Sequence, residues 1–105
     1  MEKNEEEIQE MQIIDQNLHN ILLQKQAFQM ELSETKSAQK EIEKSGEVFK
    51  LVGELMIKAE KEKVKEDLAT KEKVLSMRIK SIEKQEDSLT KRLEELRNKF
   101  SNLAK

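Results

Sequence analysis

The sequence contains no cysteine and no proline, and only two of its 105 residues are glycine. Without cysteine, the chain can have no disulfide framework, no thiol chemistry and no zinc finger. Without proline, nothing interrupts the backbone hydrogen bonding of a long helix. The two glycines, Gly46 and Gly53, are too few and too far apart to form a phosphate-binding loop. These absences favour a long-helical protein without nucleotide, metal or disulfide chemistry.

Aromatic residues and long apolar runs are also scarce. The chain has three phenylalanines and no tryptophan or tyrosine, and its longest apolar runs, at 21–23 and 55–57, are three residues long. Such runs are too short for a membrane span or for the apolar segment of a signal peptide. A compact core would need more large apolar side chains than this chain has. We therefore expect a soluble, cytoplasmic protein that does not act at a membrane.

The polar residues show no catalytic or metal-binding constellation. His19 is the only histidine, and it lies beside a predicted seam residue on an exposed helix face, with no partners for a metal site or a triad. Aspartate and glutamate are abundant, but lysines follow them at three or four residues, which is typical of solvated helix pairs. A net charge of −2 gives no reason to expect nucleic acid. We expect a protein that is not an enzyme and has no cofactor.

Charged residues make up 40% of the chain, and their distribution is uneven. Residues 1–45 hold ten acidic and five basic side chains, whereas residues 61–105 hold nine acidic and thirteen basic ones. An acidic segment and a basic segment attract each other when they lie side by side, although single surface pairs contribute little. The charges therefore favour a chain that folds back on itself.

Apolar residues recur with a heptad period in two segments, which predicts helices over about 5–44 and about 61–104. Each helix would be roughly 60 Å long at 1.5 Å per residue. Ser45-Gly46 follows the first segment, and we expect Gly46 to end the helix in a left-handed conformation. The predicted seam comprises Met11, Ile14, Leu18, Ile21, Lys25, Phe28, Leu32, Thr35, Gln39 and Ile42 in the first helix, and Leu68, Glu72, Leu75, Ile79, Ile82, Glu86, Leu89, Leu93, Leu96, Phe100 and Leu103 in the second.

The heptad disappears between the two helices, where valine and isoleucine are concentrated over about 47–59. Two short strands around a turn at Val52-Gly53-Glu54 fit this composition, while a continuous helix through Gly53 is the alternative. A lone hairpin is at best marginally stable, and its edges offer unpaired backbone groups to other chains. We expect it to be the oligomerisation element, in a sheet or barrel made from several copies. Its apolar residues are Val48, Phe49, Leu51, Val52, Leu55, Met56 and Ile57.

An antiparallel pairing with a constant sum of residue numbers near 107 brings the two seams together. It opposes Leu32 to Leu75, but it also opposes Thr35 to Glu72, so we expect a looser seam near the hairpin. At the other end Phe100 faces Glu7 and has no apolar partner. An apolar but poorly closed tip is typical of a binding surface, and fraying of the termini is the alternative. The predicted tip surface is Met1, Ile8, Met11, Phe100 and Leu103.

The order helix, short hairpin, helix in about 105 residues resembles the beta-type subunit of prefoldin, in its short archaeal form. The resemblance covers nearly the whole chain. It is most specific in the hairpin, where Val48-Phe49-Lys50-Leu51-Val52-Gly53 leads into Leu55-Met56-Ile57-Lys58. Further matching stretches are Leu22-Leu23-Gln24-Lys25-Gln26, Lys61-Glu62-Lys63-Val64 and Ile82-Glu83-Lys84-Gln85-Glu86. The run of glutamates at the N-terminus departs from the family pattern.

The resemblance implies a single prefoldin beta-like domain over residues 1–105 and an ATP-independent co-chaperone. In that family two alpha-type and four beta-type subunits join their hairpins into a β-barrel, from which six coiled coils project. Unfolded client proteins are held at the coiled-coil tips and passed to a group II chaperonin of the thermosome type. The implied partners are therefore the prefoldin alpha subunit, other beta subunits, the chaperonin and client chains. A non-catalytic coiled-coil scaffold or adaptor, with no strand pairing between chains, is the alternative.

Overall fold

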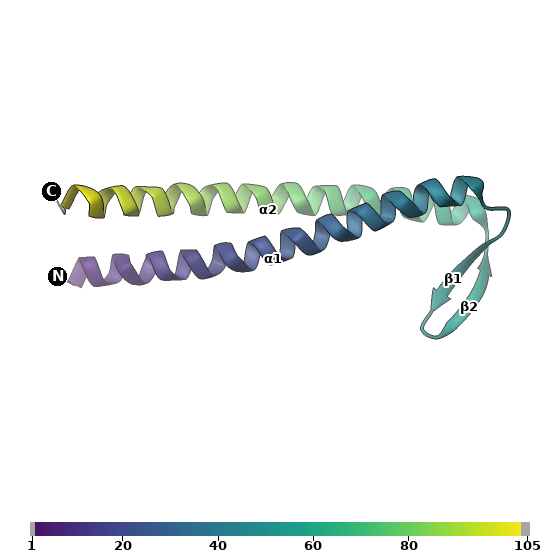
Figure 1. Cartoon of the computed structure of the whole chain (residues 1–105), viewed down its shortest axis with the longest axis horizontal. Coiled ribbons are helices and arrows are strands. Elements are labelled where there is room, and N and C mark those ends of the chain that lie inside the picture. The colour runs from purple at the N-terminus through teal and green to yellow at the C-terminus, as the bar shows by residue number, and fades with distance from the viewer. Residues whose placement is uncertain (1, 104–105) are drawn as a thin grey trace. The chain divides into compact units, whose positions relative to one another are not determined.

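The computed structural model describes the backbone of residues 2–103 and the side chains of residues 4–102. Helix α1 spans Glu2–Lys44, strands β1 and β2 span Val48–Val52 and Leu55–Ala59, and helix α2 spans Lys61–Leu103 (Figure 1). The predicted fold class of two long helices joined by a β-hairpin is therefore confirmed, and a continuous helix through Gly53 is excluded. The chain forms two compact units, which are described separately. The terminal unit comprises the residues up to 27 and from 79 onward, and the hairpin unit comprises Phe28–Arg78.

In the terminal unit α1 and α2 run antiparallel, so that α1 begins and α2 ends at the same end of the unit (Figure 1). Its core is a single seam of heptad residues. Ile14, Leu93 and Leu96 form a buried cluster, against which Met11, Leu18 and Leu89 pack. Ile21 and Ile82 are also buried, each with 7% of its surface exposed. These positions are the ones that the heptad period predicts to face the partner helix.

In the hairpin unit the same two helices pack through Ile42 and Leu75, which are 6% and 2% exposed. Polar residues also take part in this seam. Thr35 is 3% exposed, and its hydroxyl donates a hydrogen bond of 2.8 Å to the Glu31 carbonyl. Gln39 Nε2 donates to Glu72 Oε2 at 2.9 Å. Thr35 and Gln39 thus have hydrogen-bond partners within the unit, and the looser seam near the hairpin stays a prediction.

Helix α1 ends at Lys44, as expected, but for a different reason. Gly53 is the only glycine with a positive φ, so Gly46 does not adopt the left-handed conformation. Lys61, the first residue of α2, instead donates from Nζ to the carbonyl oxygens of Ser45 at 3.0 Å and Glu43 at 3.4 Å. The last carbonyls of a helix lack intrahelical partners, and a lysine can satisfy them. Lys61 therefore ties the start of α2 to the end of α1.

The hairpin turns at Gly53-Glu54, between the paired residues Val52 and Leu55. Gly53 has a φ of 62°, and Glu54 is not among residues with positive φ. A two-residue loop with a positive φ only at its first position has the type II′ pattern, in which glycine is favoured at that position. The sequence predicts the position of the turn, and the structure shows its type.

Candidate functional site

The hairpin is the largest uncovered apolar feature of the hairpin unit. The strands pair antiparallel in the register Val48↔Ala59, Phe49↔Lys58, Lys50↔Ile57, Leu51↔Met56 and Val52↔Leu55. Because successive side chains of a strand point to opposite faces, Phe49, Leu51 and Met56 share one face. Val48, Val52, Leu55 and Ile57 share the other. Each face also carries one lysine, Lys58 on the first and Lys50 on the second, so both faces are mainly apolar.

Most of this apolar surface is open in the single chain. Leu51, Leu55 and Met56 are 69%, 68% and 68% exposed, and Phe49, Val52 and Ile57 are about half exposed. Val48 is half-buried, at the point where β1 follows α1. A shallow groove lies beside Val48 and Phe49, lined by the apolar residues Ala38, Ile42, Val64 and Leu68 and by the polar residues Glu41, Ser45 and Glu47. The seven predicted hairpin residues thus lie together on one element, and six of them are exposed.

The predicted tip residues lie in the terminal unit, and the structure describes three of the five side chains. Ile8 is 46% exposed. Met11 packs against the cluster of Ile14, Leu93 and Leu96, and Phe100 is half-buried. Met1 and the side chain of Leu103 lie outside the described residues. The tip therefore combines an exposed isoleucine with two residues that are only partly closed into the seam.

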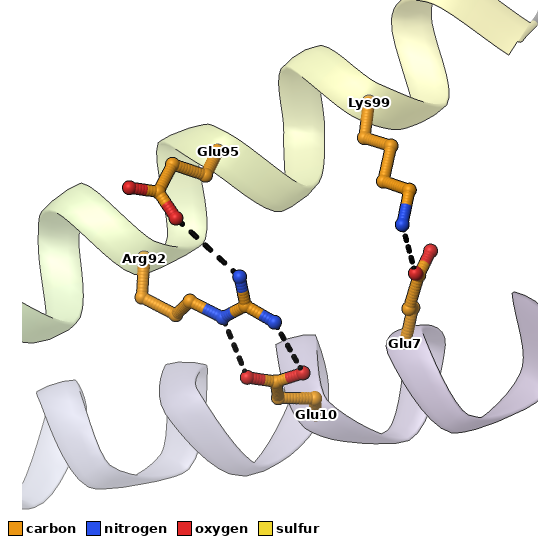
Figure 2. Close-up of polar contacts among 5 residues, drawn as sticks. All are labelled: Glu7, Glu10, Arg92, Glu95 and Lys99. Atoms are coloured by element: carbon orange, nitrogen blue, oxygen red, sulfur yellow. Dashed lines mark hydrogen bonds and ion pairs between the residues drawn. The ribbon is translucent and has the colours of Figure 1, made fainter. Parts of the chain in front are cut away.

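Charged residues of the same unit join the two helices (Figure 2). The Arg92 guanidinium makes a two-pronged contact with the Glu10 carboxylate, Nε to Oε1 at 2.7 Å and Nη2 to Oε2 at 3.1 Å. Its Nη1 also donates to Glu95 at 3.4 Å. Nearer the end of α2, Lys99 donates to Glu7 Oε1. The hydrogen bond and charge of Arg92 lower the pKa of the Glu10 carboxyl, and Glu10 in turn raises the pKa of Arg92.

Cross-helix polar pairs are the feature that sequence reasoning missed. Lys25, a seam residue, forms an ion pair of 3.3 Å with Glu86 and a longer one with Glu83. Further pairs join Glu43 to Lys65 at 2.8 Å and Glu31 to Lys71 at 3.2 Å. The acidic first segment and the basic last segment indicated this attraction in general. Which charged residues pair depends on how far one helix is shifted along the other. The heptad period does not specify this shift to within one turn.

Among residues 4–102 no group of three histidine, cysteine, aspartate or glutamate side chains is placed to hold a metal ion. His19 is exposed, as its position beside the seam indicated. In the part of the chain that the structure describes, no helix is long and apolar enough to cross a membrane. The features that the structure assembles are therefore two apolar surfaces and a set of ion pairs.

Known proteins resemble this chain both in sequence and in structure. The prefoldin subunit family matches residues 5–105. The prefoldin subunit beta of Thermococcus onnurineus is 41% identical over 88 residues, which are 81% of this chain and 76% of that protein. The prefoldin subunit beta of Pyrococcus furiosus is 33% identical over 94 residues, which are 87% and 80% of the two chains.

A solved structure shows the same fold. The crystal structure of the prefoldin beta subunit from Thermococcus strain KS-1 matches with a TM-score of 0.87 and 32% sequence identity, over 96% of this chain and 91% of that one. The resemblance seen in the hairpin and the two heptad segments is thereby confirmed. This chain belongs to the prefoldin subunit family and is similar to its archaeal beta subunits.

Proposed function

We propose that this chain is a subunit of a cytoplasmic, ATP-independent holdase that keeps unfolded polypeptide from aggregating and passes it to a group II chaperonin. Membership of the prefoldin family implies a co-chaperone role and assembly with other prefoldin subunits. We further propose that two alpha-type and four beta-type subunits form a hexamer. This hexamer holds client proteins at its coiled-coil tips and transfers them to the chaperonin. The proposed role involves no catalysis, cofactor, nucleic acid or membrane.

The exposed apolar side chains on both faces of the hairpin are the main structural support for this proposal. Leu51 and Met56, opposite each other on one face, are more than two-thirds exposed. Leu55 is equally exposed on the other face. A two-stranded sheet with mainly apolar faces and two unpaired edges is at best marginally stable alone in water. Pairing with hairpins of other subunits would cover this surface, so we assign the oligomerisation role to Val48, Phe49, Leu51, Val52, Leu55, Met56 and Ile57.

The client surface is assigned to the tip residues Met1, Ile8, Met11, Phe100 and Leu103. Partly exposed apolar side chains at Ile8, Met11 and Phe100 support this assignment. A single such tip would bind weakly, since its apolar area is small. Several tips on one assembly hold a flexible chain through their high effective concentration, without a tight site on any one of them. This arrangement suits clients that share no sequence.

Native mass spectrometry of the chain, alone and mixed with an alpha-type prefoldin subunit, tests the assembly. We expect a complex of two alpha-type and four copies of this chain. A monomer or dimer that is indifferent to the partner would contradict hairpin pairing between chains. In that case the non-catalytic scaffold or adaptor would be the better interpretation.

Replacement of Phe100 and Leu103 by serine tests the tip. We expect the variant to assemble normally and to bind an unfolded probe about tenfold more weakly, because buried apolar area is lost from each contact. Aggregation suppression of a chemically unfolded protein gives the readout. Serine at Leu22 and Leu23, which are 45% and 52% exposed, is the matched control. Equal suppression by both variants would refute the assignment of the tip.

A further inference from the structure

Glu7 interrupts the apolar seam at the end of the terminal unit. It lies four residues before Met11, at the position where the heptad would place an apolar side chain facing α2. Only 14% of its side chain is exposed. Lys99 donates to Oε1, whereas Oε2 is shielded from solvent and has no hydrogen-bond partner among the described residues. A carboxylate in this place is costly to bury, so the outermost layer of the seam is weakly closed.

The next turn inward is closed by a second ion pair at the surface. Arg92 and Glu10 contact each other through two hydrogen bonds (Figure 2), and their side chains are 47% and 40% exposed. Glu95 accepts a further hydrogen bond from Arg92 Nη1. Exposed ion pairs of this kind are screened by salt. The end of the terminal unit is thus joined by contacts that depend on ionic strength, in addition to the apolar cluster of Ile14, Leu93 and Leu96.

Two buried apolar residues of α2 lie close in the chain to these pairs. Leu96 is 1% exposed and Leu93 is 5% exposed, and both share a helix turn with Arg92 or Lys99. Separation of the helices at this end would uncover both leucines. The uncovered surface would be larger than the one that Ile8 and Phe100 offer in the closed form.

We propose that the two cross-helix ion pairs form an electrostatic clasp whose opening exposes Leu93 and Leu96 to unfolded polypeptide. The clasp consists of Glu7, Glu10, Arg92 and Lys99. This inference rests on the proposed holding function, and it adds that the strength of holding is set by how often the clasp opens. Higher ionic strength weakens the clasp and increases the exposed apolar area, since the Debye length falls from roughly 30 Å at 0.01 M to roughly 3 Å at 1 M salt.

Amide hydrogen exchange of residues 92–102 measures the opening, in the assembly with the alpha-type subunit. In the unaltered chain we expect exchange to accelerate between about 0.02 M and about 0.5 M sodium chloride. In Glu7→Leu a leucine faces Phe100 and closes the seam, so exchange slows by about tenfold and depends less on salt. Glu6→Leu is the control, because it removes the same charge from an exposed position one residue away.

Arg92→Gln gives a prediction of opposite sign, because it removes the contact with Glu10 without adding apolar area. We expect faster exchange of the same amides and little further effect of salt. Exchange rates that are identical in Glu7→Leu and Glu6→Leu would overturn the clasp. So would exchange in the unaltered chain that does not respond to salt.

Binding of reduced, carboxymethylated α-lactalbumin, a permanently unfolded probe, connects the clasp to holding. We expect about tenfold weaker binding by Glu7→Leu, tighter binding by Arg92→Gln and no change in Glu6→Leu. Slower exchange in Glu7→Leu without weaker binding would overturn the inference and leave the holding function intact. An unaltered assembly that binds no probe would refute the holding function, and with it the role of the clasp in holding, whatever the exchange rates show.

Discussion

Single apolar residues of the seam carry much of the stability of this thin structure. Leu96 is the least exposed residue, at 1%. We expect Leu96→Ala to lower the free energy of unfolding by about 2–3 kcal/mol, the lower part of the range for buried leucines, because a seam next to solvent can relax around the cavity. Urea unfolding followed by circular dichroism measures the loss. Leu23→Ala, at a position 52% exposed, is the control and should cost less than about 0.5 kcal/mol. Equal losses would contradict the assigned core.

At the same scale, the heptad period identifies which residues are buried but not which polar residues meet. Ile14, Ile21, Leu75, Leu93 and Leu96 are seam residues in the sequence and are buried in the structure. The heptad does not predict the partners of the polar seam residues. These partners depend on how far one helix is shifted along the other and on how far each side chain reaches. The constant-sum pairing opposes Thr35 to Glu72, whereas Glu72 accepts a hydrogen bond from Gln39 and the Thr35 hydroxyl turns back to its own helix.

At the scale of the helix pair, the seam contains a charged layer that favours one register. Lys25 and Glu86 form an ion pair of 3.3 Å, with 21% and 30% of their side chains exposed. Polar layers of this kind specify alignment in coiled coils at some cost in stability. A slip of the helices by one turn would separate Lys25 from Glu86.

Replacement of Lys25 and Glu86 tests this layer. We expect Lys25→Leu alone to destabilise the chain by about 1 kcal/mol, because Glu86 is left partly buried beside an apolar side chain. The double variant with Glu86→Leu should recover this loss or exceed the original stability, since leucines pack across the seam. A double-mutant cycle from urea unfolding gives the coupling energy. Additive effects of the two substitutions would show that the pair has no role in alignment.

The elements themselves could be predicted more fully than their junctions. Loss of the heptad and enrichment in valine and isoleucine placed the strands, and Gly53 placed the turn. The end of α1 was predicted at the correct residue through an incorrect mechanism, since Gly46 has no positive φ and Lys61 instead donates to the carbonyls of Glu43 and of Ser45, the residue after the helix. A long side chain that reaches back over 16 residues leaves no local sequence signal.

At the scale of the whole molecule, the sequence predicts that the hairpin needs partners, but it does not specify their number. The apolar residues on both faces of the hairpin are visible in the strand alternation alone. The number of copies that cover these faces depends on strand pairing between chains, which no periodicity within one chain encodes. Family membership supplies the expectation of a hexamer, and its test belongs to assembly experiments.

Two methionines with nearly equal exposure allow a test of the proposed assembly surface. Met56 on β2 is 68% exposed, and Met77 on α2 is 70% exposed. Neither supports the single chain, so Met56→Lys and Met77→Lys should both leave its free energy of unfolding within about 0.5 kcal/mol of the original. If the hairpins pair between subunits, Met56→Lys buries a charge in the assembled sheet and abolishes the complex with the alpha-type subunit. Met77→Lys should assemble normally. Native mass spectrometry of the two mixtures decides, and a Met56→Lys chain that still forms the full complex would remove the hairpin from the interface.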